Sequence, residues 1–334
     1  MKRDLRYEIC DMSRFENAHH ISHITHQKRK ILVIVGPTAS GKTLLSECIA
    51  ELLPIEIISA DSRQIYKYLN IGTAKPPKEF LKKIKHHFVD DLEPNEDFSA
   101  GEFSKQGKAI IEEIFSRNKI PLVLCGTGLY LRALIDGIFD GPSANNEIRE
   151  RLWKRYYEDG GEKLLEELRA IDCEAAKKML PTNKLRIVRA LEVFELTGKP
   201  ISKIQKEETQ AGNFLTIMFG LEWERKILYE KINQRVEEML ANGFLEEVKE
   251  ILAMGFSSKL NALQTVGYKE AFSFLQGEIS FEKMKELFKQ NSRRYAKRQL
   301  TWFRGDSRIH WLHIRTIEDL PLLAKDIVEQ FILQ

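Results

Sequence analysis

The feature that most constrains the fold of this chain is a glycine-rich segment between two apolar stretches. Residues 36–43, Gly36-Pro37-Thr38-Ala39-Ser40-Gly41-Lys42-Thr43, match the phosphate-binding loop (P-loop) pattern GxxxxGK[ST] at every fixed position. The apolar run 31–35 before them is typical of a strand buried on both faces, and residues 44–53 after them have helical spacing. This order of strand, loop and helix predicts an α/β fold whose loop binds a diphosphate or triphosphate.

Apolar runs elsewhere in the chain extend the same pattern. We expect further strands at 55–59, 121–125, 214–219 and 309–314, and helices at 109–115 and over most of 224–304. Residues 146–211 are rich in Glu, Lys, Arg and Leu, with helical periodicity and no clear strand. The prediction is an α/β protein with a P-loop NTPase-like parallel sheet core, formed by 31–145 and 212–334 with its C-terminal helices, and a helical insertion domain at 146–211.

The spacing of the cysteines and the composition of the first thirty residues indicate in which cellular compartment the protein works. The cysteines form no CxxC pair, which is typical of a reduced, cytoplasmic protein. No apolar run reaches the roughly 18 residues that a membrane helix needs, and residues 1–30 lack the apolar core of a signal peptide. This leader holds His19, His20, His23 and His26. Because no acid or thiol lies among these histidines, a flexible leader is favoured over a metal site.

The P-loop also predicts which groups contact the phosphates. Its glycines allow the main chain to curl, so that N–H groups and the N-terminus of the next helix face the anion. Lys42 would reach the outer phosphate, and the Thr43 hydroxyl would be a ligand of Mg²⁺. The strand at 121–125 ends in Cys125-Gly126-Thr127, without the acid that P-loop nucleotidases place there, and no Asn-Lys-x-Asp guanine motif occurs. The P-loop, which is also known as an ATP-binding motif, therefore does not by itself specify ATP. Motor and switch proteins are disfavoured, because the acid and the guanine motif that they use are missing.

Two polar residues follow predicted strands at the edge where ligands bind to parallel sheets. Asp61 comes after the strand at 55–59, and Thr127 comes after the strand at 121–125. An acid beside a bound diphosphate is a candidate general base. Asp61 could equally cap the turn that follows it. Position alone leaves both roles of Asp61 open.

Several sequence blocks, in a fixed order, resemble one known family. The blocks are Gly36–Thr43, Ser59–Tyr66, Asn70–Pro76, Gly126–Tyr130, Arg189–Val193, Val266–Glu270 and Ala296–Arg304. Together they are similar to the bacterial tRNA dimethylallyltransferases, the isopentenyl-diphosphate:tRNA transferase family. The resemblance runs from about residue 31 to residue 313, and its ordered blocks are far more specific than the P-loop alone.

The resemblance implies an Mg²⁺-dependent prenyltransferase that modifies tRNA. Such an enzyme transfers a dimethylallyl group from dimethylallyl diphosphate to N6 of adenosine 37, next to the anticodon, and releases diphosphate. By the resemblance, the P-loop and Arg235 hold the diphosphate, and Thr43 binds the metal. Asp61 is the general base, which would resolve the two roles left open above, and Thr127 orients the target adenine. The protein is expected to be a cytoplasmic monomer.

The resemblance also implies a set of residues that contact the anticodon stem-loop. In the core these are Asp61, Ser62, Arg63, Gln64, Thr127, Gln264, Thr265, Val266, Gly267, Tyr268, Lys269, Lys297, Arg298, Gln299, Leu300, Thr301, Trp302, Phe303 and Arg304. In the insertion they are Arg149, Leu185, Arg186, Ile187, Val188 and Arg189.

The distribution of charge supports an RNA partner, although the formal net charge of +3 does not. Between Leu287 and Arg304 there are six basic residues and no acid, with Tyr295, Trp302 and Phe303 among them. Phosphate neutralisation combined with base stacking explains both features. A P-loop kinase of a small metabolite would leave this segment unexplained, and a non-catalytic RNA-binding module would not need Lys42, Thr43, Asp61 and Thr127 intact.

Overall fold

The computed structural model describes residues 29–139, 141–142 and 145–334. Cys10 and the histidines of the leader, with the choice between a flexible segment and a metal site, lie outside the described residues. The described chain divides into two compact units. The first comprises the described residues up to Ser99 with Gln106–Leu131 and Asn213–Gln334, and the second comprises Ala100–Lys105 and the described residues of Arg132–Gly212.

The first unit is built on a parallel sheet of six strands in the order β3-β2-β4-β1-β5-β6. The strands are β1 (Lys30–Val35), β2 (Ile55–Ala60), β3 (His86–His87), β4 (Ile120–Cys125), β5 (Leu215–Trp223) and β6 (Ile309–Ile314). The predicted α/β class and parallel sheet are therefore confirmed. The two-residue β3 was not predicted, because so short a segment has no periodicity to detect.

The register of the central strands places three loops side by side. Val35 of β1 and Ala60 of β2 both pair with Cys125 of β4, so these three strands end at the same level. The glycine-rich loop, the turn that begins at Asp61 and the loop that contains Thr127 consequently leave the sheet at one edge. This is the edge at which open parallel sheets bind their ligands.

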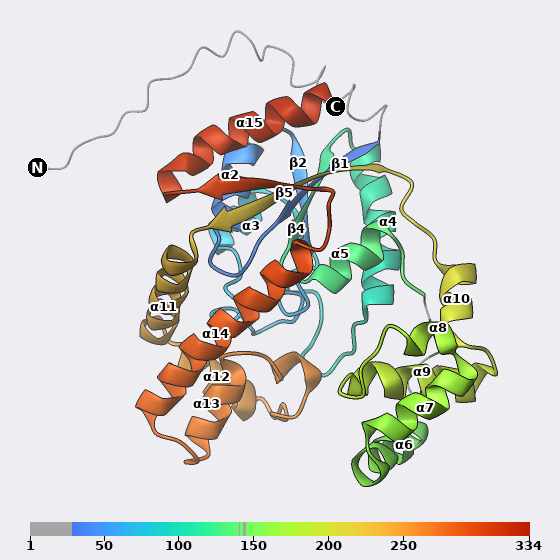
Figure 1. The fold of residues 1–334 in the computed structure, drawn as a ribbon. Helices are drawn as coiled ribbons and strands as arrows, with labels where there is room; N and C mark the ends of the chain where they lie inside the picture. Colours follow the sequence, from blue (N-terminus) through green and yellow to red (C-terminus); the bar gives the residue numbers. More distant parts are fainter. Residues whose placement is uncertain (1–28, 140, 143–144) are drawn as a thin grey trace, which may run out of the picture. The chain divides into compact units, whose positions relative to one another are not determined.

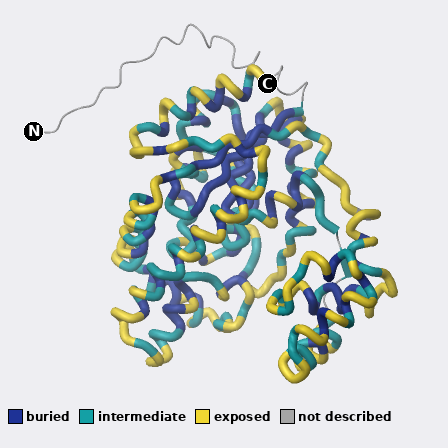
Figure 2. Tube along the Cα trace, in the orientation of Figure 1, coloured by how far each residue is buried: buried dark blue, intermediate teal, exposed yellow. Residues whose placement is uncertain are grey.

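Helices of the first unit cover the sheet and extend beyond it (Figure 1). Those wholly within it are α2 (Lys42–Ala50), α3 (Lys78–Lys83), α11 (Arg225–Ala241), α12 (Phe244–Ala253), α13 (Tyr268–Leu275), α14 (Phe281–Phe303) and α15 (Leu320–Leu333). Apolar residues of α2 and α15 join those of the strands in one core, to which Leu45 and Phe331 belong. The central strands β1, β2 and β4 are buried at every position, and the centre of the unit is dark blue in Figure 2.

The described residues of the second unit form helices around a separate core. Its helices are α6 (Asn146–Asp159), α7 (Gly161–Ile171), α8 (Cys173–Ala176), α9 (Lys184–Thr197) and α10 (Ile201–Glu208). Leu152, Leu164, Leu168 and Leu191 are buried in its core. The unit contains the predicted insertion 146–211 and also parts of two further helices, α4 (Ala100–Ser116) and α5 (Gly128–Ile135).

Within the described part of the chain, no helix is both long enough and apolar enough to cross a membrane.

Candidate active site

The glycine-rich loop between β1 and α2 adopts a conformation that depends on its glycines. Gly41 has φ of 91°, in the left-handed region where glycine is favoured. A side chain at Gly36 would place its Cβ only 2.6 Å from Oγ of Ser40. That Ser40 hydroxyl is buried and has no hydrogen-bond partner among the described residues. Because buried polar atoms are rarely left unpaired, this hydroxyl indicates a ligand with hydrogen-bonding groups.

Lys42, at the first position of α2, folds back over the loop. Its Nζ donates hydrogen bonds to the carbonyl oxygens of Gly36, at 2.8 Å, and Pro37, at 2.9 Å. Burial, and after it the positive charge of Arg235, lowers the pKa of Lys42 to about 8. The neighbouring Thr43 lines a cavity that opens in front of the loop. The loop therefore combines a desolvated ammonium group with a hydroxyl at a helix N-terminus.

A cavity of about 450 Å³ opens in front of this loop. Arg235 enters it from α11, and burial lowers the pKa of its guanidinium. Among the described residues, no group accepts a hydrogen bond from Arg235. The charged side chains that line the cavity, four basic and two acidic, are Lys42, Arg63, Lys231, Arg235, Asp61 and Glu238. The excess of positive charge suits an anion with more than one negative charge, such as a diphosphate.

Asp61 lies in the same cavity, and its two carboxylate oxygens have different surroundings. Oδ1 accepts a hydrogen bond of 2.8 Å from the main-chain N–H of Arg63, so it caps the turn after β2. Oδ2 accepts no hydrogen bond from the described residues and points toward Gly126, where a Cβ would lie 3.3 Å from it. The two roles left open by the sequence are thus compatible, because one oxygen caps the turn and the other remains available.

Thr127 is connected to Asp61 through the turn and to α14 through Tyr295. Its Oγ1 accepts a hydrogen bond of 3.3 Å from the N–H of Ser62. Tyr295 reaches the same hydroxyl from α14, and burial raises the pKa of its phenol. The Arg298 guanidinium lies 5.6 Å from the centre of the Tyr295 ring. The sequence predicted Tyr295 only as an aromatic residue of the basic segment and not as part of this site, although its one-turn spacing from Gln299 places both on one helix face.

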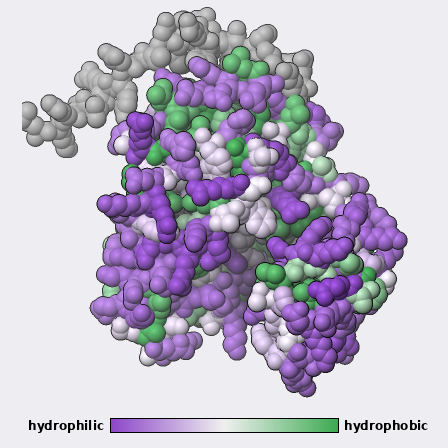
Figure 3. Space-filling model, in the orientation of Figure 1, coloured by the Kyte–Doolittle hydropathy of each residue, from purple (hydrophilic) through white to green (hydrophobic). Residues whose placement is uncertain are grey.

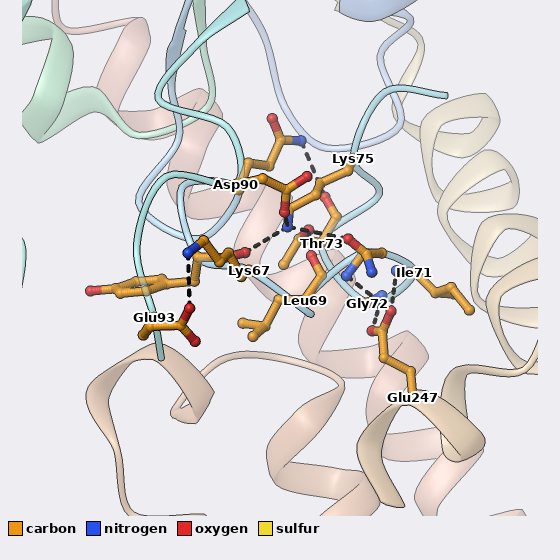
Figure 4. A network of polar contacts seen from close by, with 12 residues as sticks. Lys67, Leu69, Ile71, Gly72, Thr73, Lys75, Asp90, Glu93 and Glu247 are labelled. Atoms are coloured by element: carbon orange, nitrogen blue, oxygen red, sulfur yellow. Dashed lines mark hydrogen bonds and ion pairs between the residues drawn. The ribbon is translucent and has the colours of Figure 1, made fainter. Parts of the chain in front are cut away.

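A second wall of the cavity is a loop held by Glu247 of α12 (Figure 4). The Glu247 carboxylate accepts main-chain hydrogen bonds from Asn70, Ile71 and Gly72 at 2.7–3.1 Å. It also accepts a hydrogen bond of 2.6 Å from the Tyr268 hydroxyl. Tyr268 is fully buried in this network. Its side chain therefore supports the cavity wall and has no surface with which to reach tRNA, the contact predicted for it.

The residues predicted to contact tRNA differ widely in exposure. On α14 and just after it, the exposed ones are Lys297, Arg298, Thr301, Trp302 and Arg304. Hydrophilic side chains predominate on the face of the molecule that Figure 3 shows. Gln264 and Lys269 are exposed as well. Those with buried side chains are Ile187, Val188, Tyr268, Gln299 and Phe303. At the buried positions the side chains contribute to packing, so any contact with RNA would have to come from the main chain.

In the second unit, two of the arginines predicted to contact tRNA are bound to a buried carboxylate. Arg149 and Arg189 each lie 2.8 Å from Glu192, which is completely buried. Burial opposes the ionisation of Glu192, but hydrogen bonds from Arg189, the Asn145 N–H and Arg149 outweigh it and lower the pKa of this carboxyl group. Breaking these pairs would leave a buried charge without partners. Arg149 and Arg189 therefore stabilise this unit, and Leu185 and Arg186 are exposed; the contact of these residues with tRNA stays a prediction.

Fold and site together define a class of protein. A parallel sheet carries a P-loop-type glycine-rich loop at its carboxyl edge, and the Asp61 carboxylate and the desolvated cations of Lys42 and Arg235 line the adjoining cavity. These features define the class of α/β proteins with a site suited to a small polyanion and a potential base beside it.

Comparisons with known proteins identify the family. The IPP transferase family model matches residues 64–306. The chain is 44% identical over 304 residues to the tRNA dimethylallyltransferase of Thermoanaerobacter sp. strain X514, covering 90% of this chain and 96% of that protein. It is 43% identical over 310 residues to the tRNA dimethylallyltransferase of Finegoldia magna, covering 91% and 98%. The chain belongs to the IPP transferase family.

Solved structures agree with this assignment. The full-length tRNA isopentenylpyrophosphate transferase of Bacillus halodurans superimposes with a TM-score of 0.66 at 35% identity, covering 91% of this chain and 98% of that one. A eukaryotic dimethylallyltransferase acting on tRNA gives a TM-score of 0.75 at 28% identity, covering 90% of this chain and 78% of that one.

Proposed function

We propose that the protein transfers a dimethylallyl group from dimethylallyl diphosphate to N6 of adenosine 37 in tRNA, with release of diphosphate. The observation that carries this proposal is the joint placement of the glycine-rich loop, Arg235 and Asp61 around one cavity, with the Thr127 hydroxyl bonded to the turn that follows Asp61. Relatives named tRNA dimethylallyltransferase, at 44% identity over nearly their whole length, support it. We further propose that the enzyme acts in the cytoplasm, where unmodified tRNA is found, and as a monomer.

The leaving diphosphate would lie against the loop. Lys42 and Arg235 would stabilise the negative charge that grows on it as the carbon–oxygen bond breaks, and the N–H groups at the start of α2 would add hydrogen bonds. The buried Ser40 hydroxyl, without a partner among the described residues, belongs to the same loop and would donate to a phosphate oxygen. These groups are held by the fold before substrate binds, so little reorganisation accompanies the reaction.

The residues present fit a magnesium ion bound chiefly through the substrate. The described residues contain no cluster of three His, Cys, Asp or Glu that could hold a metal ion by itself. Mg²⁺ in phosphate sites commonly keeps several waters and uses few protein ligands, so the Thr43 hydroxyl, diphosphate oxygens and water form a suitable set. When bound, the ion would neutralise charge on the diphosphate.

The nucleophile would be the exocyclic amine of adenine, whose lone pair is delocalised into the ring. The Asp61 Oδ2 atom is available to take the proton from this amine as the new carbon–nitrogen bond forms. The Thr127 hydroxyl would orient the base by a hydrogen bond. Since a stacked base cannot enter a cavity, adenosine 37 would have to leave the anticodon-loop stack first. The exposed basic face of α14 would bind phosphates nearby.

Mass analysis of the nucleosides of tRNA tests this function directly. Unmodified tRNA is incubated with the protein, Mg²⁺ and dimethylallyl diphosphate, and adenosine 37 should gain one dimethylallyl group. A parallel incubation with radiolabelled ATP tests the kinase alternative. Label transferred from ATP to an acceptor, without prenylation of tRNA, would overturn the proposal.

A further inference from the structure

Gln299 joins the two loops that would hold the two substrates. It lies on the buried side of α14 and is 7% exposed. Its Oε1 accepts a hydrogen bond of 2.9 Å from the main-chain N–H of Thr38, in the glycine-rich loop. Its Nε2 donates a hydrogen bond of 2.8 Å to the carbonyl oxygen of Gly126, directly before Thr127. A single amide thus uses its acceptor on one loop and its donor on the other.

This link has no substitute among the hydrogen bonds of the described residues. The Thr127 loop is otherwise bonded to the carbonyl oxygen of Ala60 at the end of β2, to the Ser62 N–H and to Tyr295, and none of these belongs to the glycine-rich loop. The glycine-rich loop is otherwise bonded within itself and to Trp223 of β5. A Cβ at Gly126 would lie 3.4 Å from Nε2 of Gln299 and 3.3 Å from Oδ2 of Asp61, so Gly126 lies next to both groups.

We propose that Gln299 is a positioning residue for prenyl transfer, which fixes the distance between the diphosphate cradle and the groups that hold the adenine. The inference rests on the proposed function and adds a residue to its site. In a transfer between two bound substrates, the allylic carbon and the amine must meet in line and at short range. A misplacement of about 1 Å can lower the rate about 10²-fold. An amide bonded to both loops resists such a displacement.

The same two turns of α14 also present the surface proposed to bind RNA. Lys297 and Thr301 are exposed on the side of α14 opposite Gln299, and Arg298 and Trp302 are exposed on one flank between the two sides. In this proposal, α14 binds RNA through its exposed residues and holds the glycine-rich loop and the Thr127 loop through Gln299 on its buried side. The resemblance to the family places Gln299 among the tRNA contacts, whereas its burial and its two hydrogen bonds assign it to the site itself.

The experiment compares two substitutions at this position with a matched control. Gln299→Leu removes both hydrogen bonds with little change in volume. Gln299→Glu keeps the shape and the acceptor for the Thr38 N–H, but places an oxygen against the Gly126 carbonyl. Gln290→Leu is the control, because Gln290 lies on the same helix and bonds to neither loop. For each variant, kcat, KM for both substrates, the Kd for tRNA and the fraction folded are measured.

We expect both Gln299 variants to lose about 10- to 100-fold in kcat per folded molecule. Their Kd for tRNA should stay within about twofold of the wild-type value, because no RNA-facing group changes. An unchanged kcat in either folded variant would overturn the proposal. So would a loss of tRNA affinity with kcat retained, which would make Gln299 an RNA contact. If Gln299→Leu does not fold, the isosteric Gln299→Glu decides the question. Absence of prenylated adenosine with the wild-type protein would instead refute the proposed function.

Discussion

At the scale of single residues, the cavity differs from the rest of the first unit in how its charges are balanced. The buried carboxylate of Glu56, away from the cavity, has Arg117 and Lys119 as close partners. In the cavity, Arg235 is desolvated yet has no hydrogen-bond acceptor among the described residues. Uncompensated charge in a buried position costs stability, so an anionic ligand is the expected compensation.

The shifted pKa of Lys42 predicts how substrate binding depends on pH. Burial and the nearby Arg235 lower this pKa to about 8, although Asp61 and Cys125 act in the opposite direction. The ammonium form, which pairs with diphosphate, therefore dominates below this pKa and is lost as the pH rises through it. We expect kcat/KM for dimethylallyl diphosphate to be level near neutral pH, and to fall by up to about tenfold per pH unit once the pH exceeds the pKa. A profile that stays level to a pH of about 9.5, more than one unit above this pKa, would contradict the prediction.

The two oxygens of Asp61 allow its capping role to be separated from its role as a base. The informative change is Asp61→Asn, because the amide oxygen can still accept a hydrogen bond from the Arg63 N–H, whereas the amide cannot take up a proton. We expect a fall in kcat of about 10²–10⁴-fold, with tRNA affinity and thermal stability close to wild type. Single-turnover kinetics and tRNA titrations measure the two effects. Near-normal turnover would remove Asp61 as the base.

At the scale of elements, the sequence predicted best those strands that are buried along their whole length. The strands β1, β2 and β4 are buried at every position, and their apolar runs predicted them to within one residue at each end. The roles of Tyr268 and Gln299 could not be predicted in this way. Each depends on a partner distant in the sequence, Glu247 and the loop residues Thr38 and Gly126, and no local pattern contains that information.

The two faces of α14 predict a separation between RNA affinity and chemistry. Lys297 and Arg298 are exposed, and neither forms an ion pair with a described acidic residue. Replacing each by alanine should weaken tRNA binding and reduce the slope of log K against log salt by about 0.7–0.9 for each phosphate that is no longer neutralised. Lys283→Ala is a suitable control, because Lys283 lies at the other end of α14 and pairs with Glu286. Filter-binding titrations at several salt concentrations provide the measurement, and an unchanged slope would assign these residues to the fold.

At the scale of the whole molecule, the core around the sheet and the core of the helical unit share no residue among those that the structure describes. Leu122 belongs to the core of the sheet, and Leu168 belongs to the core of the helical unit. Both side chains are completely buried. The loop, Arg235, Asp61 and Thr127 all lie in the first unit, while Leu185 and Arg186 lie in the second. Separate cores permit one unit to lose stability while the other keeps its structure.

This organisation predicts different consequences for the same substitution in the two cores. Leu168→Ala should cost about 2–5 kcal/mol, because it removes buried methyl groups and leaves a cavity. Hydrogen exchange should accelerate in α7 and α9 but not in β1 or β4, and the affinity for diphosphate with Mg²⁺ should be retained while tRNA affinity falls. Leu122→Ala, the matched change in the sheet, should accelerate exchange in β1 and β4 and weaken diphosphate binding. If both variants accelerate exchange throughout the described chain, the two cores unfold as one cooperative unit.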